Sequence, residues 1–194
     1  MDFEAFKRKE EEKPPALKRK LPEMVPDIEH IEIKRLSVAD VEEATLVLRK
    51  CTVETNEDEV RGIIKEGLSY GAYVDRMLVG VGLAWVASYD PKKKALRGDH
   101  RNAAYVEEVV VLLQYEGKGI RNKILQAIEN EAQAKGLSYT VALITPGVPE
   151  SSESSVTHYG TKTEKVLVQR GYELNKTPEG ILAVKDVTYS KEIK

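Results

Sequence analysis

Apolar positions change their spacing near the middle of the chain, and this change predicts a strand followed by a helix. The segment from Ala104 to Leu113 is largely apolar and rich in β-branched residues, which is typical of a strand buried on both faces. A polar break runs from Gln114 to Gly119. Apolar residues then recur every three or four positions from Ile120 to Ala132, which predicts a helix that ends near Gly136.

Similar patterns predict the elements on either side. Ser37 with Asp40, and Asn56 with Glu59, have the spacing of residues that cap helix N-termini. The predicted strands span residues 30–36, 69–74, 78–89, 104–113, 138–145, 172–175 and 181–189, and the predicted helices span 41–51, 56–67, 120–136 and 162–170. The order is therefore β-α-α-β-β-β-α-β-α-β-β.

The composition is that of one folded domain with an extension. Of 194 residues, 41% are hydrophobic, and a domain of about 160 residues buries close to 70% of its unfolded surface. We expect a domain at residues 29–189, a charged, proline-containing extension at 1–28 and a short tail at 190–194. The extension is either a partly helical, solvated tail or a segment that docks on a protein partner or a nucleic acid through Phe3 and Phe6, with Lys18-Arg-Lys20.

Charge and residue counts argue against several classes of protein. The net charge of −2 gives no basic excess, so nucleic-acid binding is not favoured. The single cysteine, Cys51, excludes an internal disulfide, and its place on an apolar helix face indicates a structural role. The histidines lack the spacing of metal ligands. With no long apolar run and no signal peptide, we expect a soluble, cytoplasmic protein without a membrane segment.

The central strand, its glycine-containing break and the helix that follows form an arrangement suited to anions. Glycines let backbone N–H groups face a ligand, and the first turn of a helix has free donors and a positive dipole end. The spacing Gly117-Lys-Gly119 matches neither the dinucleotide-binding fingerprint nor a phosphate-binding P-loop. On spacing alone, an ordinary strand-to-helix turn explains it equally well.

These residues, from Tyr105-Val-Glu-Glu-Val-Val-Val111 through Gly117-Lys-Gly119 to the end of the helix, resemble the acetyl-CoA-binding core of the GNAT superfamily of N-acetyltransferases. The resemblance implies an α/β fold with a mixed central sheet of six to seven strands and four helices. It also implies acetyl-CoA as the acetyl donor. The residues expected to bind it are Val109, Val110, Val111, Glu116, Gly117, Lys118, Gly119, Ile120 and Arg121.

Two positions depart from the family pattern. Alignment of the apolar helix face with that of the family places Glu116 where the family has Arg or Gln, and Arg121 where it has Gly or Ala. The other register, Gln114-x-x-Gly117-x-Gly119, restores the motif letters but misplaces the apolar helix face, so we prefer the first. A carboxylate about 6 Å from a phosphate costs roughly 3 kcal/mol at an effective dielectric near 20. Lys118 and Arg121 offset this charge, or Arg121 fills the space that the pyrophosphate needs.

The resemblance also implies an acidic residue on the central strand near the acceptor nitrogen. We expect Glu107 to be the catalytic base and hold Glu108 second, because successive strand residues face opposite sides unless a bulge intervenes. The alternative is a buried carboxylate paired with a basic neighbour. Leu167 replaces a tyrosine that is frequent in the family, so Tyr159, or His158 beside it, is the candidate proton donor.

The segment between the first two predicted helices borders the acceptor site in the family. Glu54 and Glu57, with His158 from a later loop, are therefore candidate substrate-binding residues. The simpler interpretation of the two glutamates is that they complement the dipole at a helix N-terminus.

Together these features predict an acetyl-CoA-dependent N-acetyltransferase that acetylates a primary amine, either a small molecule or a protein. The alternative is a catalytically inactive GNAT-like module that serves as a binding or assembly subunit. A homodimer is possible in either case.

Overall fold

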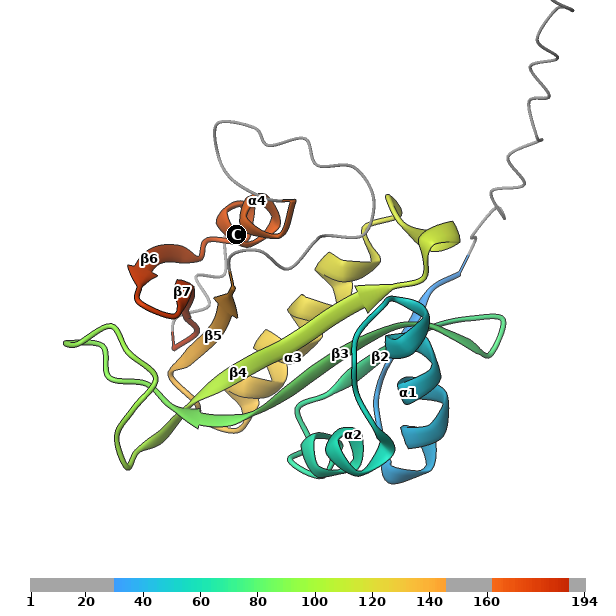
Figure 1. Ribbon diagram of the computed structural model, residues 1–194, viewed down its shortest axis with the longest axis horizontal. Helices are drawn as coiled ribbons and strands as arrows, with labels where there is room; N and C mark the ends of the chain where they lie inside the picture. The colour runs from blue at the N-terminus through green and yellow to red at the C-terminus, as the bar shows by residue number, and fades with distance from the viewer. Residues whose placement is uncertain (1–29, 146–161, 189–194) are drawn as a thin grey trace, which may run out of the picture.

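The computed structural model describes residues 30–145 and 162–188, which form a mixed β-sheet with helices on both faces (Figure 1). The strands are β1 (Glu32–Arg35), β2 (Tyr70–Val74), β3 (Met77–Ser88), β4 (Arg101–Val111), β5 (Tyr139–Ile144), β6 (Glu173–Thr177) and β7 (Gly180–Asp186). The helices are α1 (Val41–Lys50), α2 (Glu57–Ile64), α3 (Ile120–Ala134) and α4 (Lys162–Gln169). Two short 3-10 helices, η1 (Val38–Asp40) and η2 (Leu113–Tyr115), complete the set and were not predicted.

The predicted order of strands and α-helices is confirmed. The sheet has seven strands in the order β1-β2-β3-β4-β5-β7-β6. Only β4 and β5 pair in parallel, and the other neighbours are antiparallel. This is the mixed sheet that the family resemblance implied. Within the described ranges, no helix has both the length and the apolar character needed to cross a membrane.

Both predicted caps are present. The Ser37 backbone N–H and hydroxyl donate to the Asp40 carboxylate at 2.7 and 2.6 Å. The Asn56 side chain accepts from the Glu59 backbone N–H at 3.0 Å. These bonds satisfy backbone donors that would otherwise lack partners where η1 and α2 begin.

Glycines on β3 allow α3 to lie close to the sheet. A Cβ at Gly82 would lie 2.3 Å from Ile124 Cγ2 and 3.0 Å from Ile128 Cδ1. A Cβ at Gly80 would lie 3.1 Å from the Val110 carbonyl oxygen. Because alternate strand residues face opposite sides, Val81, between these glycines, faces the side of the sheet that α1 and α2 cover (Figure 1).

A buried carboxylate fastens α3 to the C-terminal hairpin. Glu129 is only 4% exposed. It accepts bonds from Arg170 Nε at 3.0 Å, Arg170 Nη2 at 2.7 Å, Lys185 Nζ at 2.6 Å and the Tyr172 hydroxyl at 3.1 Å. Burial, together with this carboxylate, raises the pKa of Tyr172 far above its usual range. Since a buried charge is tolerated only when it is paired, these contacts keep α3, β7 and the residues after α4 together.

Replacement of Gly82 by alanine is expected to destabilise the fold. The added methyl group overlaps Ile124, so we expect Gly82→Ala to lower the free energy of unfolding by about 1–3 kcal/mol. Gly62→Ala in α2 is the matched control, because a Cβ there has no neighbour within 4 Å. The control should leave stability unchanged or raise it by up to about 1 kcal/mol. Denaturant unfolding measures both, and equal effects would contradict the proposed packing constraint.

Candidate functional site

A β-bulge in the central strand turns two neighbouring glutamates toward the same cavity. Leu83 of β3 is opposite Glu108, but the next residue, Ala84, is opposite Val106, so Glu107 is the extra residue. An extra residue breaks the alternation of side chains along a strand. Glu107 and Glu108 both line one cavity. The bulge is the condition under which two successive strand residues were expected to be able to face the same cleft.

This cavity has a volume of about 270 Å³ and is acidic. The segment between α1 and α2, together with α2 itself, forms one wall, and β3 with β4 forms the other. The lining residues are Val53, Glu54, Thr55, Glu59, Ile63, Leu83, Glu107 and Glu108. Four carboxylates therefore share one small space, and such a lining attracts cations.

The predicted substrate-binding residues separate in the structure. Glu54 lines the cavity, whereas Glu57 is exposed outside it and its carboxylate lies 3.7 Å from Arg61. Glu59, which sequence analysis treated only as part of a helix cap, lines the cavity and accepts a bond from the Thr55 hydroxyl at 3.2 Å. His158 and Tyr159 lie outside the described residues. Leu167 is buried in the core, at 3% exposure.

The two strand glutamates have different surroundings. Glu107 is exposed and accepts a bond at 3.0 Å from the indole N–H of Trp85, whose ring packs against Tyr105 with centroids 5.2 Å apart. Glu108 is half-buried, and loss of hydration raises the pKa of its carboxyl. The Val109 N–H and the charge of Arg121 oppose this rise, while Glu107 adds to it.

Beside this cavity, the backbone of β4 has a free edge. β4 pairs with β5 from Ala103 to Val106, and in the described part of the sheet no pairing with β5 is seen beyond Val106, although pairing with β3 continues to Val111. The carbonyl of Val109 accepts instead from Arg121 Nη1 at 3.3 Å, and its N–H donates to the Glu108 carboxylate at 3.3 Å. The carbonyl of Val111 accepts from the Cys51 thiol at 3.6 Å.

The turn that follows this edge is open to solvent. Gly117 and Gly119 have φ angles of +75° and +73°, and a Cβ at either position would meet no atom of the described residues within 4 Å. In the part of the chain that the structure describes, no side chain caps the start of α3. Arg121, the second residue of α3, forms an ion pair with Glu116 at 3.0 Å. The positive charge expected to offset Glu116 is therefore in contact with it.

Cys51 is half-buried beside this edge. Burial raises the pKa of its thiol, which keeps it protonated and poorly nucleophilic at neutral pH. Its contacts agree with the structural role expected from sequence.

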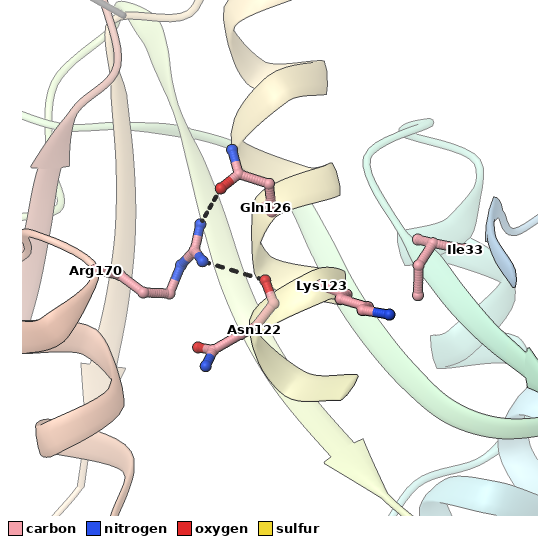
Figure 2. A pocket seen from close by; sticks show the side chains of 5 residues that line it. All are labelled: Ile33, Asn122, Lys123, Gln126 and Arg170. Atoms are coloured by element: carbon pink, nitrogen blue, oxygen red, sulfur yellow. Dashed lines mark hydrogen bonds between the residues drawn. The ribbon is translucent and has the colours of Figure 1, made fainter. Parts of the chain in front are cut away.

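A second depression lies on the outer side of α3 (Figure 2) and is separate from the acidic cavity. Its volume is about 340 Å³, and it is lined by Ile33, Asn122, Lys123, Gln126 and Arg170. Figure 2 shows Arg170 bonded to the Asn122 carbonyl and to the Gln126 side chain, at 3.2 and 3.0 Å. The Arg170 guanidinium also bonds Glu129, so the depression lies where structural contacts join α3 to the residues after α4. The acidic cavity is therefore the better candidate site.

The burial of Glu108 predicts a pH-dependent cost to stability. Its pKa in the folded protein is above the ordinary 4.5. At pH values between the ordinary pKa and the pKa in the folded protein, the folded state therefore binds more protons than the unfolded state. Stability therefore falls as pH rises through the interval, and the cost is complete above the folded pKa. Glu108→Gln should thus gain stability relative to the wild type at neutral pH and lose that gain below the ordinary carboxyl range.

Denaturant unfolding at the two pH values measures this difference, with Glu179→Gln in the exposed β6–β7 turn as the control. Carboxyl-carbon NMR gives the pKa directly, with the signal assigned through its loss in Glu108→Gln. A Glu108 pKa at or below 4.5 would contradict the expectation.

Comparisons with known proteins give structural matches only. A scan against protein-family models finds no match, and a sequence search of curated proteins finds none either. Among solved structures, the chain is similar to the PaiA N-acetyltransferase from Thermoplasma acidophilum in complex with coenzyme A, with a TM-score of 0.60 and 15% identity over 81% of this chain and 99% of that one.

Two further structures agree with this match. The ribosomal-protein-S18-alanine N-acetyltransferase from Escherichia coli has a TM-score of 0.62 and 11% identity over 85% of this chain and 99% of that one. A putative acetyltransferase of the GNAT family from Desulfovibrio desulfuricans has a TM-score of 0.57 and 12% identity over 81% and 99%. At such low identities these likenesses establish architecture alone, and the chain has the fold of the GNAT N-acetyltransferases.

Proposed function

We propose that this protein is an acetyl-CoA-dependent N-acetyltransferase that transfers the acetyl group directly to a primary amine. The observation that carries the proposal is the bulge at Glu107, which turns two carboxylates into one cavity beside the free edge of β4. After η2, the chain continues from that edge into the open glycine turn. Groups suited to an amine and groups suited to an anionic donor are thus adjacent.

The residues present fit the donor. The backbone groups of Val109 and Val111 offer hydrogen-bonding partners to the amides of a pantetheine arm. The N–H groups from Gly117 to Arg121, with the uncapped start of α3, suit a pyrophosphate, and open space above both glycines leaves room for it. Acetyl-CoA supplies the activated acyl group, a thioester.

Glu108 is the better base of the two glutamates, although sequence analysis placed Glu107 first. A base works best when its pKa approaches the working pH, and burial raises the pKa of Glu108 in that direction. Glu107 is held by Trp85 and adds negative charge that attracts a cationic amine. The cationic amine first loses a proton to solvent. The neutral nitrogen then attacks the thioester carbon, gives its second proton to Glu108 as the C–N bond forms, and the C–S bond breaks to release the thiolate.

The alternative function, a module without turnover that binds or assembles, also has an observation in its favour. Arg121 lies over the Val109 carbonyl and pairs with Glu116, so part of the donor surface is occupied by the chain itself. Leu167 offers no hydroxyl to protonate a leaving thiolate.

Calorimetry with acetyl-CoA, followed by an acetyl-transfer assay with small primary amines and peptide N-termini, separates the two functions. We expect micromolar binding by the wild type. Glu108→Gln should retain that affinity and lose at least about 100-fold in turnover, because general bases contribute 10²–10⁴-fold. Glu179→Gln controls for the loss of a carboxylate outside the cavity. Absence of acetyl-CoA binding, or binding without transfer to any amine, would favour the inactive module.

A further inference from the structure

The free edge of β4 is covered by side chains of the same chain. Leu112 donates its N–H to Val79 of β3 at 2.9 Å. Since the backbone groups of successive strand residues point to alternate sides, those of Val109 and Val111 point away from β3. Arg121 bonds the Val109 carbonyl, which a ligand lying along this edge would otherwise use.

The contacts of Arg121 are of the kind that breaks at low cost. Its side chain is 41% exposed and that of Glu116 is 34% exposed. Exposed ion pairs contribute about 0.2–1 kcal/mol because water competes for both partners. The bond to Val109 is long, at 3.3 Å. The contacts of Arg121 therefore position its side chain but are weak enough to break when a ligand competes for the same groups.

We propose that Arg121 is a latch on the donor-binding edge and that it moves from Val109 and Glu116 to the phosphate of the incoming donor. The inference rests on the proposed function. A donor amide that pairs with the Val109 carbonyl needs the position of the guanidinium. A phosphate at the adjacent turn offers Arg121 a stronger, charge-assisted and bidentate partner. Binding of the donor thus displaces the Arg121 guanidinium from the Val109 carbonyl and gives it the donor phosphate as a new partner.

Glu116 has an opposing role. In the free protein its carboxylate holds Arg121 over the edge. Once Arg121 moves, Glu116 lacks that partner and lies near the phosphate, where its charge is unfavourable. Glu116 therefore lowers the affinity for the donor in two ways: it stabilises Arg121 over the edge in the free protein, and it repels the phosphate in the complex.

Two probes separate the release of Arg121 from Val109 and Glu116 from its binding to the donor phosphate. S-Acetylpantetheine carries the amides of acetyl-CoA but no phosphate, so it requires release of the latch and offers Arg121 nothing in return. NMR titration of the full chain gives the affinity for each probe. For Arg121→Met we expect about fivefold tighter binding of S-acetylpantetheine, the upper range of an exposed pair. Acetyl-CoA should bind about tenfold more weakly, because a charged hydrogen bond to phosphate is lost.

Glu116→Gln weakens the hold on Arg121 and keeps the guanidinium, so both probes should bind more tightly. Lys123→Met is the matched control: it removes a positive charge two residues further along α3, on the side of the depression in Figure 2. It should leave S-acetylpantetheine binding unchanged.

The outcomes distinguish the latch from the donor assignment. If Arg121→Met shifts both affinities in the same direction, or leaves S-acetylpantetheine binding unchanged or undetected while acetyl-CoA binds, the exchange is overturned and the proposed donor stands. If neither probe binds any form of the protein, the donor assignment itself fails, and the latch fails with it.

Discussion

The close seating of α3 on β3 is the constraint on which the candidate site depends. At Gly82 even a methyl group would overlap Ile124, so the distance between helix and sheet is set by the absence of a side chain. The start of α3 is consequently held beside the end of β4, and Arg121 can reach back to Val109. Glu129 provides a second anchor further along the helix, through Arg170 and Lys185. Any shift of α3 would separate the turn from the strand edge that it faces.

The sequence alone was enough to predict the framework. Strands and helices are specified by local periodicity, and the caps at Ser37 and Asn56 involve residues only three positions apart. Such features depend on neighbours along the chain, which a single sequence shows directly.

The arrangement of the site depends on contacts that the sequence does not show. The extra residue at Glu107 results from the pairing of β3 with β4, and two adjacent glutamates look the same with or without a bulge. Glu59 has the local signature of a cap, and only the packing of α2 near β4 makes it part of the cavity. The bond from Arg121 to Val109 joins residues that lie on different elements. The sequence therefore predicted the helices and strands better than it predicted the side-chain contacts between them.

Val109 is the residue at which the two halves of the candidate site meet. Its N–H bonds a carboxylate of the acidic cavity, and its carbonyl bonds the guanidinium at the glycine turn. A ligand that pairs with both backbone groups of Val109 must displace both side chains. Burial is already the largest cause of the raised pKa of Glu108, and displacement of its carboxylate removes the Val109 N–H bond that opposes this rise. In the proposed function, a donor bound along this edge would therefore remove contacts that oppose the raised pKa of Glu108, so donor binding and proton transfer would both depend on Val109.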